Sequence, residues 1–160
     1  MLITPAARSL LLILVLCARA FASPGQHADT AAIDKFIASQ ESYESGQQAE
    51  GFRTVLTGDL NHDGIPDAAV LYTLEGQNGT NNYVQYLAVF VRVKGHLVPF
   101  AHAAVGGKNY RAIKIEAIEN DMILCSTLGY APKDPSCCPT IKGSTRYALE
   151  GNKLKELGHK

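Results

Sequence analysis

The sequence has no tryptophan, only four cysteines in 160 residues and no surplus of either charge. Basic and acidic residues number 15 each, so the chain lacks the positive excess with which proteins bind nucleic acids. No segment repeats with a period of about 20 to 50 residues, which excludes solenoids and propellers built within this chain. The nucleophile elbow, the zinc-protease helix motif and the phosphate-binding loop are also missing. These absences favour one domain without a familiar catalytic motif.

The longest apolar run lies at the N-terminus, where Leu10 to Leu16 follow Arg8. With the small residues around Ala22, this run predicts a secretory signal over residues 1–22, and a cut after Ala20 is the alternative. The run is far shorter than the roughly 20 residues of a membrane-spanning helix, so we expect no membrane span. We therefore expect residues 23–160 to form a single exported domain, periplasmic or secreted, with two more acidic than basic residues.

Hydrophobic spacing predicts one helix followed by a series of strands. Apolar residues at helical spacing after Asp29 and Thr30 predict a helix over residues 30–40. Alternating or apolar runs predict strands at residues 52–57, 68–74, 83–93, 97–104, 110–118, 122–128, 145–149 and 153–157. The short connections between these strands exclude the helical crossovers that parallel sheets need. We predict an α+β fold, an antiparallel β-meander of about seven strands with one N-terminal helix.

Residues 59–67, Asp-Leu-Asn-His-Asp-Gly-Ile-Pro-Asp, connect two of these predicted strands. Oxygen-bearing side chains fall at the first, third, fifth and ninth positions, with glycine at the sixth, as in a Ca2+-binding loop. The predicted Ca2+ ligands are the side chains of Asp59, Asn61, Asp63 and Asp67 and the carbonyl of Ile65. His62 is expected to point outward. The alternative is a metal-free turn in which the Asp and Asn side chains accept backbone N–H groups.

Residues 58–70 resemble the acidic core of FG-GAP and related calcium repeats. Integrin-like propellers contain this repeat several times, whereas this chain contains it once, so the resemblance implies a local calcium loop and no propeller. Dockerin and EF-hand loops are similar as far as Asp67. However, Val70 stands at the twelfth position, where an EF-hand has a bidentate glutamate. The metal is therefore expected to be structural, with no calcium-triggered opening of helices.

A wider resemblance covers residues 59–157 and links the chain to small exported bacterial proteins of unassigned function, many of them lipoproteins. It is carried by the acidic loop, a Gly-Thr turn at 79–80, the strand at 86–90 and Asp-Pro-Ser-Cys-Cys-Pro-Thr at 134–140. The resemblance implies export, with a Gram-negative periplasm as the expected location, and implies no reaction. This chain departs from the lipid-anchored members because Leu16 precedes Cys17, where a lipoprotein signal has a small residue.

Removal of the signal would take Cys17 and leave Cys125, Cys137 and Cys138. An oxidising compartment favours one disulfide. Adjacent cysteines bridge each other only through an eight-membered ring, so we expect Cys125 to bond one of the other two and leave one unreactive thiol. The alternatives are a vicinal redox pair or soft-metal site at Cys137 and Cys138, and an intermolecular bridge. No Cys-x-x-Cys spacing supports thioredoxin-like chemistry.

The histidines, His27, His62, His96, His102 and His159, are scattered along the sequence. Only His96 and His102 are expected to share a strand face, where a copper or zinc pair is one interpretation and a solvated edge the other.

The sequence predicts a calcium-stapled, non-catalytic binding module in the cell envelope. Its recognition surface would be the polar turn at 76–82 and the loop at 132–140, and an inhibitor or immunity-type protein acting on a protein partner is one form. The alternative is an envelope protein that handles redox equivalents or soft metals through Cys137 and Cys138. A hydrolase ranks third, because the metal would occupy the clustered carboxylates.

Overall fold

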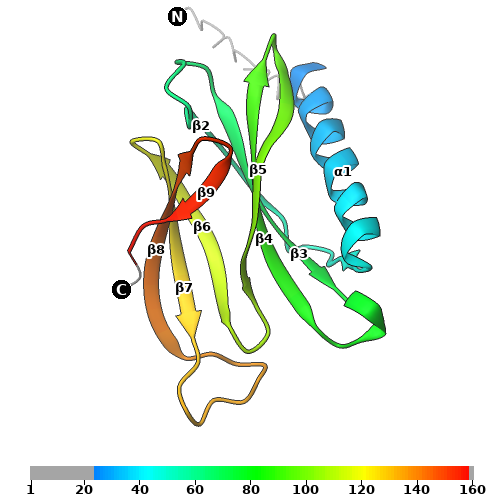
Figure 1. The fold of residues 1–160 in the computed structure, drawn as a ribbon, viewed down its shortest axis with the longest axis vertical. Coiled ribbons are helices and arrows are strands. Elements are labelled where there is room, and N and C mark those ends of the chain that lie inside the picture. Colours follow the sequence, from blue (N-terminus) through cyan, green and yellow to red (C-terminus); the bar gives the residue numbers. More distant parts are fainter. Residues whose placement is uncertain (1–23, 159–160) are drawn as a thin grey trace, which may run out of the picture.

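The computed structural model describes residues 24–158, and the predicted signal with Cys17 lies outside this range, as does His159. The described part begins with helix α1 (Pro24–Glu44) and continues with strands that a single 3-10 turn interrupts. The elements are β1 (Gln47–Gln48), β2 (Thr54–Gly58), β3 (Asp67–Glu75), η1 (Gln77–Gly79), β4 (Tyr83–Val93), β5 (His96–Gly107), β6 (Arg111–Glu119), β7 (Met122–Gly129), β8 (Ile141–Glu150) and β9 (Lys153–Glu156). The predicted α+β fold with one N-terminal helix is confirmed (Figure 1).

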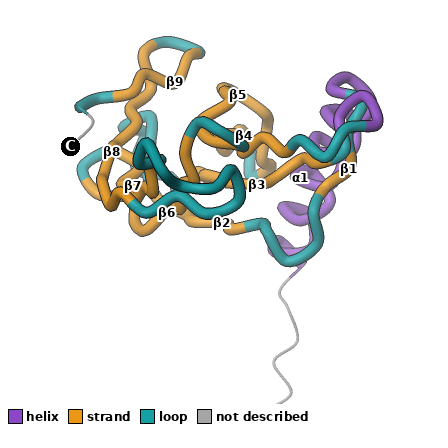
Figure 2. The backbone as a smooth tube through the Cα atoms, turned by 90° about the horizontal axis from the view of Figure 1, so that it is seen from below, coloured by secondary structure: helices purple, strands orange, loops and turns teal. Residues whose placement is uncertain are grey.

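The strands pair antiparallel in the order β1-β3-β4-β5-β6-β7-β8-β9, and β2 shares with β1 the outer edge of β3. Strands β5 and β6 meet only at Gly107 and Arg111. At this point the sheet turns over on itself, so that β6 to β8 pack against one face of β3 to β5 (Figure 2). Helix α1 covers the other face. The predicted meander is therefore folded into two layers of strands.

Strand β3 lies between two hydrophobic cores, and this explains why its sequence is almost wholly apolar. Successive side chains of a strand point to opposite faces. Ala69 and Leu71 face the core between the two layers of strands, whereas Val70 and Tyr72 face helix α1. Because β3 is covered on both sides, only Glu75 among its residues is exposed.

Helix α1 packs on the sheet through Ile33 and Ile37, which are buried, with Phe36 beside them. The helix begins at Pro24, six residues earlier than predicted, and proline is favoured in the first turn of a helix. Hydrophobic spacing missed these first turns because they are polar and carry no apolar stripe. Asp29 secures this part of the helix, since its carboxylate accepts two hydrogen bonds from the Arg92 guanidinium, at 2.9 and 2.7 Å. Side-chain pairing therefore holds a segment that hydrophobic spacing did not indicate.

Candidate functional sites at the two ends of the central strand

The acidic loop connects β2 to β3, and the backbone pair of Gly58 with Asp67 closes it. Within the loop, the side chains accept the backbone hydrogen bonds. Asp59 Oδ2 accepts the N–H of Gly64 at 2.9 Å, and Asp63 Oδ1 accepts the N–H of Ile65 at 2.8 Å. Glycine is needed at position 64 because the backbone turns there with a φ of 77°.

These hydrogen bonds act on the charge of Asp59. Desolvation opposes ionisation, but the hydrogen bonds from the backbone of residues 61–64 outweigh it and lower the pKa of Asp59. Asn61 completes the arrangement, because its Oδ1 accepts the N–H of Asp63 and its Nδ2 donates to the Asp63 carboxylate, both at 3.0 Å. The first three predicted ligands therefore lie together over one tight turn.

Asp67, the fourth predicted side-chain ligand, is fully buried. Its Oδ2 accepts the N–H of Leu60 at 3.1 Å, and its Oδ1 accepts the N–H of Arg92 at 2.9 Å. It therefore ties the loop to the end of β4, a structural role that the sequence did not indicate.

The loop fits Ca2+ in the order and chemistry of its donors. An ionised carboxylate has about four lone-pair positions, and the contacts above use only some of them. The same contacts also satisfy the metal-free turn, and among residues 24–158 no three His, Cys, Asp or Glu side chains converge as a metal-binding group. Ca2+ at Asp59, Asn61, Asp63, Ile65 and Asp67 stays a prediction.

A contact made by the fourth residue of the motif, which is not a predicted ligand, holds the acidic loop against the turn between β6 and β7. His62 is exposed, with its Nε2 2.9 Å from the carboxylate of Asp121. Asn120 and Asp121 form that turn with left-handed backbone angles of 49° and 61° in φ. The predicted strands at 110–118 and 122–128 imply a turn between them, but its contact with His62 required the fold.

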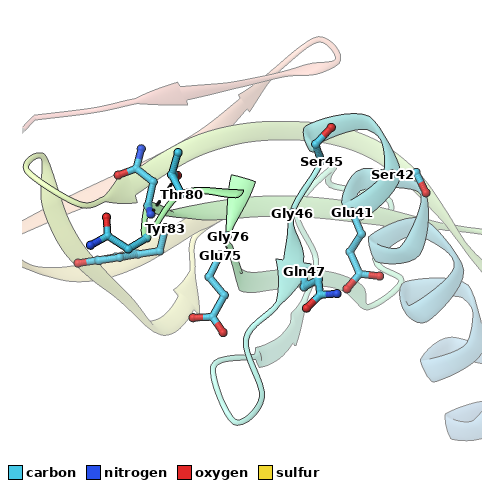
Figure 3. A pocket seen from close by; sticks show the side chains of 11 residues that line it. Glu41, Ser42, Ser45, Gly46, Gln47, Glu75, Gly76, Thr80 and Tyr83 are labelled. Carbon is cyan, nitrogen blue, oxygen red and sulfur yellow. Dashed lines mark hydrogen bonds between the residues drawn. The ribbon is translucent and has the colours of Figure 1, made fainter. Parts of the chain in front are cut away.

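The opposite end of β3 borders a polar cleft of about 680 Å³, shown in Figure 3. It lies between the C-terminal end of α1 and the turn that leads into β4. The lining residues are Glu41, Ser42, Ser45, Gly46, Gln47, Glu75, Gly76, Thr80, Asn81, Asn82 and Tyr83. Two carboxylates, Glu41 and Glu75, are in this lining, and the Lys108 ammonium donates to Asn81 Oδ1 at its rim, at 2.7 Å. The cleft contains most of the 76–82 turn that the sequence predicted as a recognition surface.

The loop between β7 and β8, residues 130–140, lies at the same end of the molecule as the cleft. Strand register shows this, because Val84 pairs with Gly107, Gly107 with Arg111, and Arg111 with Gly129 (Figure 1). Two tyrosines join the loop to the cleft. Tyr130 donates its hydroxyl proton to the Ser136 carbonyl at 2.7 Å. Burial, and then the hydrogen bond to Tyr130, raise the pKa of Tyr83.

The disulfide in this loop differs from the predicted one. Cys137 is bonded to Cys138, and Cys125 is free and buried. The expected bridge from Cys125 was wrong because this residue sits in mid-strand, paired with Ile115 on one side and Thr145 on the other. Burial raises the pKa of its thiol to about 12.

The two histidines considered as a metal pair are far apart along β5. His96 is exposed at the first position of the strand, and six residues of extended chain span about 20 Å. His102 instead lies under the helix, with its Nε2 2.7 Å from the Tyr72 hydroxyl and its ring stacked on Tyr86. Burial lowers the pKa of His102. A copper or zinc pair is therefore not assembled.

Sequence reasoning missed an ion pair between the buried guanidinium of Arg111 on β6 and the surface carboxylate of Glu156 on β9. Arg111 donates to both carboxylate oxygens of Glu156, at 2.7 and 2.9 Å, and to the Tyr147 hydroxyl at 2.6 Å. Its side chain is 5% exposed. The signal was present, because Arg111, Ile113 and Ile115 stand at every second position of β6 and so share its core face.

No protein-family model matches this sequence, and neither curated proteins nor solved structures show significant similarity to it. Within residues 24–158, no helix has the length and apolar character needed to traverse a bilayer.

Proposed function

We propose that this chain is an exported, calcium-stapled binding module without catalytic activity, which acts on a protein partner in the cell envelope as an inhibitor or immunity-type protein does. The polar cleft beside the 76–82 turn is the observation that carries this proposal. It is a concave surface with many hydrogen-bonding groups, at the end of β3, a strand that is buried on both faces up to Glu75.

Internal hydrogen bonds hold the cleft in shape without a ligand. Gly76 N–H donates to the Asn82 carbonyl at 3.0 Å, and Thr80 accepts the Asn82 N–H at 3.2 Å. Glu41 accepts the N–H of Gln48 at 2.7 Å, which fixes the helix end against β1. Binding would therefore require little ordering of the backbone, and this favours recognition of a partner by a preformed surface.

The metal has a separate role in this proposal, because Asp67 begins β3 and Glu75 ends it. Ca2+ would hold the loop at the far end of the strand and neutralise its carboxylates, and would not contact the partner. Loss of calcium would lower the stability of the fold. It would weaken partner binding only indirectly, because less of the protein would be folded.

Partner binding is tested by co-purification from an envelope extract with wild-type protein and with Tyr83→Ala. Tyr83 lines the cleft, so the variant should lose the partner while keeping its melting temperature within a few degrees. Phe52→Ala is the matched control, because Phe52 is an exposed aromatic residue outside the cleft. A partner retained equally by Tyr83→Ala would remove the cleft from the proposal.

Calcium binding is tested by thermal melts with about 2 mM Ca2+ and with chelator, given an expected affinity of about 0.1 to 1 mM. Mass action then predicts a rise in melting temperature of a few degrees for the wild type. Asp63→Ala should abolish this rise, whereas Glu50→Ala, which removes an exposed carboxylate before β2 and so away from the loop that follows β2, should keep it. Identical wild-type melts in both buffers would contradict the metal site.

A further inference from the structure

The disulfide between Cys137 and Cys138 lies at the surface, where both residues are exposed. A cross-link stabilises a fold by restricting the unfolded chain, and this effect grows with the number of residues in the closed loop. Adjacent residues close the smallest loop that a disulfide can make. This bond therefore restricts the unfolded chain far less than a bridge from Cys125 would have done.

The loop keeps its shape by other means. One carboxylate, that of Asp134, accepts the N–H of Ala131 at 2.7 Å and the N–H of Thr140 at 2.9 Å, and so clamps the two ends of the loop together. Hydrogen bonds from Ala131 and Thr140 outweigh desolvation and lower the pKa of Asp134, so the clamp is an ionised acceptor at neutral pH. The Cys138 N–H donates to the Pro135 carbonyl at 2.9 Å and closes the turn that presents the two sulfur atoms.

The third cysteine of the described chain takes no part in this chemistry. Cys125 is 4% exposed and lies in the core between the two layers of strands. Disulfide exchange requires an accessible thiolate, so Cys125 cannot attack the bond while the protein is folded. Within residues 24–158, therefore, no third thiol can reach the bond, and the attacking thiol comes from another molecule.

From this arrangement we infer that Cys137 and Cys138 form a thiol–disulfide exchange site whose substrate is a dithiol. The inference goes beyond the proposed binding function and does not depend on calcium or on the cleft.

The reaction balances in two steps. A thiolate of the dithiol attacks one sulfur atom of the Cys137–Cys138 bond, which forms a mixed disulfide and releases the other cysteine as a thiolate that takes up a proton. The second thiolate of the dithiol then attacks the first sulfur of the same dithiol in the mixed disulfide. This step closes the disulfide of the oxidised dithiol and releases the second cysteine, which is protonated in turn. The dithiol loses two electrons and two protons, and the cysteine pair gains them.

The test uses the full chain, purified under oxidising conditions, with dithiothreitol as the probe. Free thiols are alkylated in the folded protein before and after the probe is added, and the labelled cysteines are located by peptide mass spectrometry. We expect no label on Cys137 or Cys138 before reduction, a label on both after it, and one dithiothreitol oxidised per chain. Cys125 should remain unlabelled while the protein is folded.

Two variants and one stability measurement make the result decisive. Cys125→Ala should behave as the wild type does, and Cys137→Ser combined with Cys138→Ser should oxidise no dithiothreitol. The reduced protein should melt within about 5 °C of the oxidised one, because so short a loop contributes little chain entropy. Labelling of both cysteines before reduction, a bridge to Cys125, or resistance to dithiothreitol until the protein unfolds would overturn the inference. None of these outcomes alters the calcium or cleft tests.

Discussion

The buried carboxylate of Asp67 accepts the backbone N–H of Arg92 at 2.9 Å, and the side chain of Arg92 pairs with Asp29. Arg92, at the end of β4, therefore connects the acidic loop through its backbone N–H and the first turns of helix α1 through its guanidinium. The residue that ends the loop motif is consequently a structural centre as well as a predicted metal ligand.

Asp67→Ala should lower the free energy of unfolding even when no calcium is present. The substitution leaves the N–H groups of Leu60 and Arg92 without their acceptor, and each loss costs about 1 to 3 kcal/mol. We expect a total loss of about 3 kcal/mol, measured by urea unfolding in chelator. Asp63→Ala is the control, because Asp63 is exposed and should cost less than about 1 kcal/mol under the same conditions. Equal losses in the two variants would contradict the structural role of Asp67.

Glu156 should make the protein less stable in acid. The hydrogen bonds from Arg111 lower its pKa from 4.5 to about 2, so the folded state favours the ionised carboxylate. The stabilisation is fully present above the unfolded pKa near 4.5 and is lost as the pH falls toward 2. Urea unfolding of the wild type between these pH values should show the decline, and Glu156→Gln should flatten it.

The matched control for Glu156 is Glu150→Gln, which removes a carboxylate that pairs with Lys155 at an exposed site. Exposed pairs contribute little, so this variant should keep the wild-type slope. If both variants gave the same slope, the buried guanidinium would not be the cause of the acid sensitivity.

Local patterns predicted the helix and most strands because each follows from hydrophobic period and turn residues. The folding of the sheet into two layers at Gly107 could not be predicted in this way. Gly106 and Gly107 indicate a break between two strands, but they do not indicate which strands pack against each other. Three errors have physical causes. The start of α1 depends on the pairing of Asp29 with Arg92, β8 begins at Ile141 in a mostly exposed segment, and β1 is too short to show a period. The predicted Ca2+ ligands form one loop because they are consecutive in sequence, whereas the clustering of Arg111 with Glu156 needed the fold.

Gly58→Ala should destabilise the contact between the two layers of strands. A Cβ atom at this position would lie 2.7 Å from Ile118 Cγ2 and 3.0 Å from Ile118 Cβ, both closer than van der Waals contact allows. We expect a loss of about 1 to 3 kcal/mol in urea unfolding. Ile118→Ala in the same chain should recover part of the loss, because it removes the nearer atom.

Gly129→Ala is the control for Gly58→Ala, since a Cβ there meets nothing closer than 3.8 Å. It should change the free energy of unfolding by less than about 1 kcal/mol. A Gly58→Ala protein as stable as the wild type would show that the contact of β2 with β6 adjusts without cost.

His102 should produce a second pH effect, at a higher pH than Glu156 does. Burial lowers its pKa from 6.5, because the folded state favours the neutral imidazole beside Tyr72. The unfolded chain therefore binds the proton more readily, and stability should fall as the pH drops below 6.5 toward the lower folded pKa. His102→Gln should remove this step in melting temperature between about pH 5 and 7 while leaving the Glu156 decline in place. The control is His96→Gln, which changes an exposed histidine of the same strand and should keep the step. If the step remained in His102→Gln, another titratable group would be its cause.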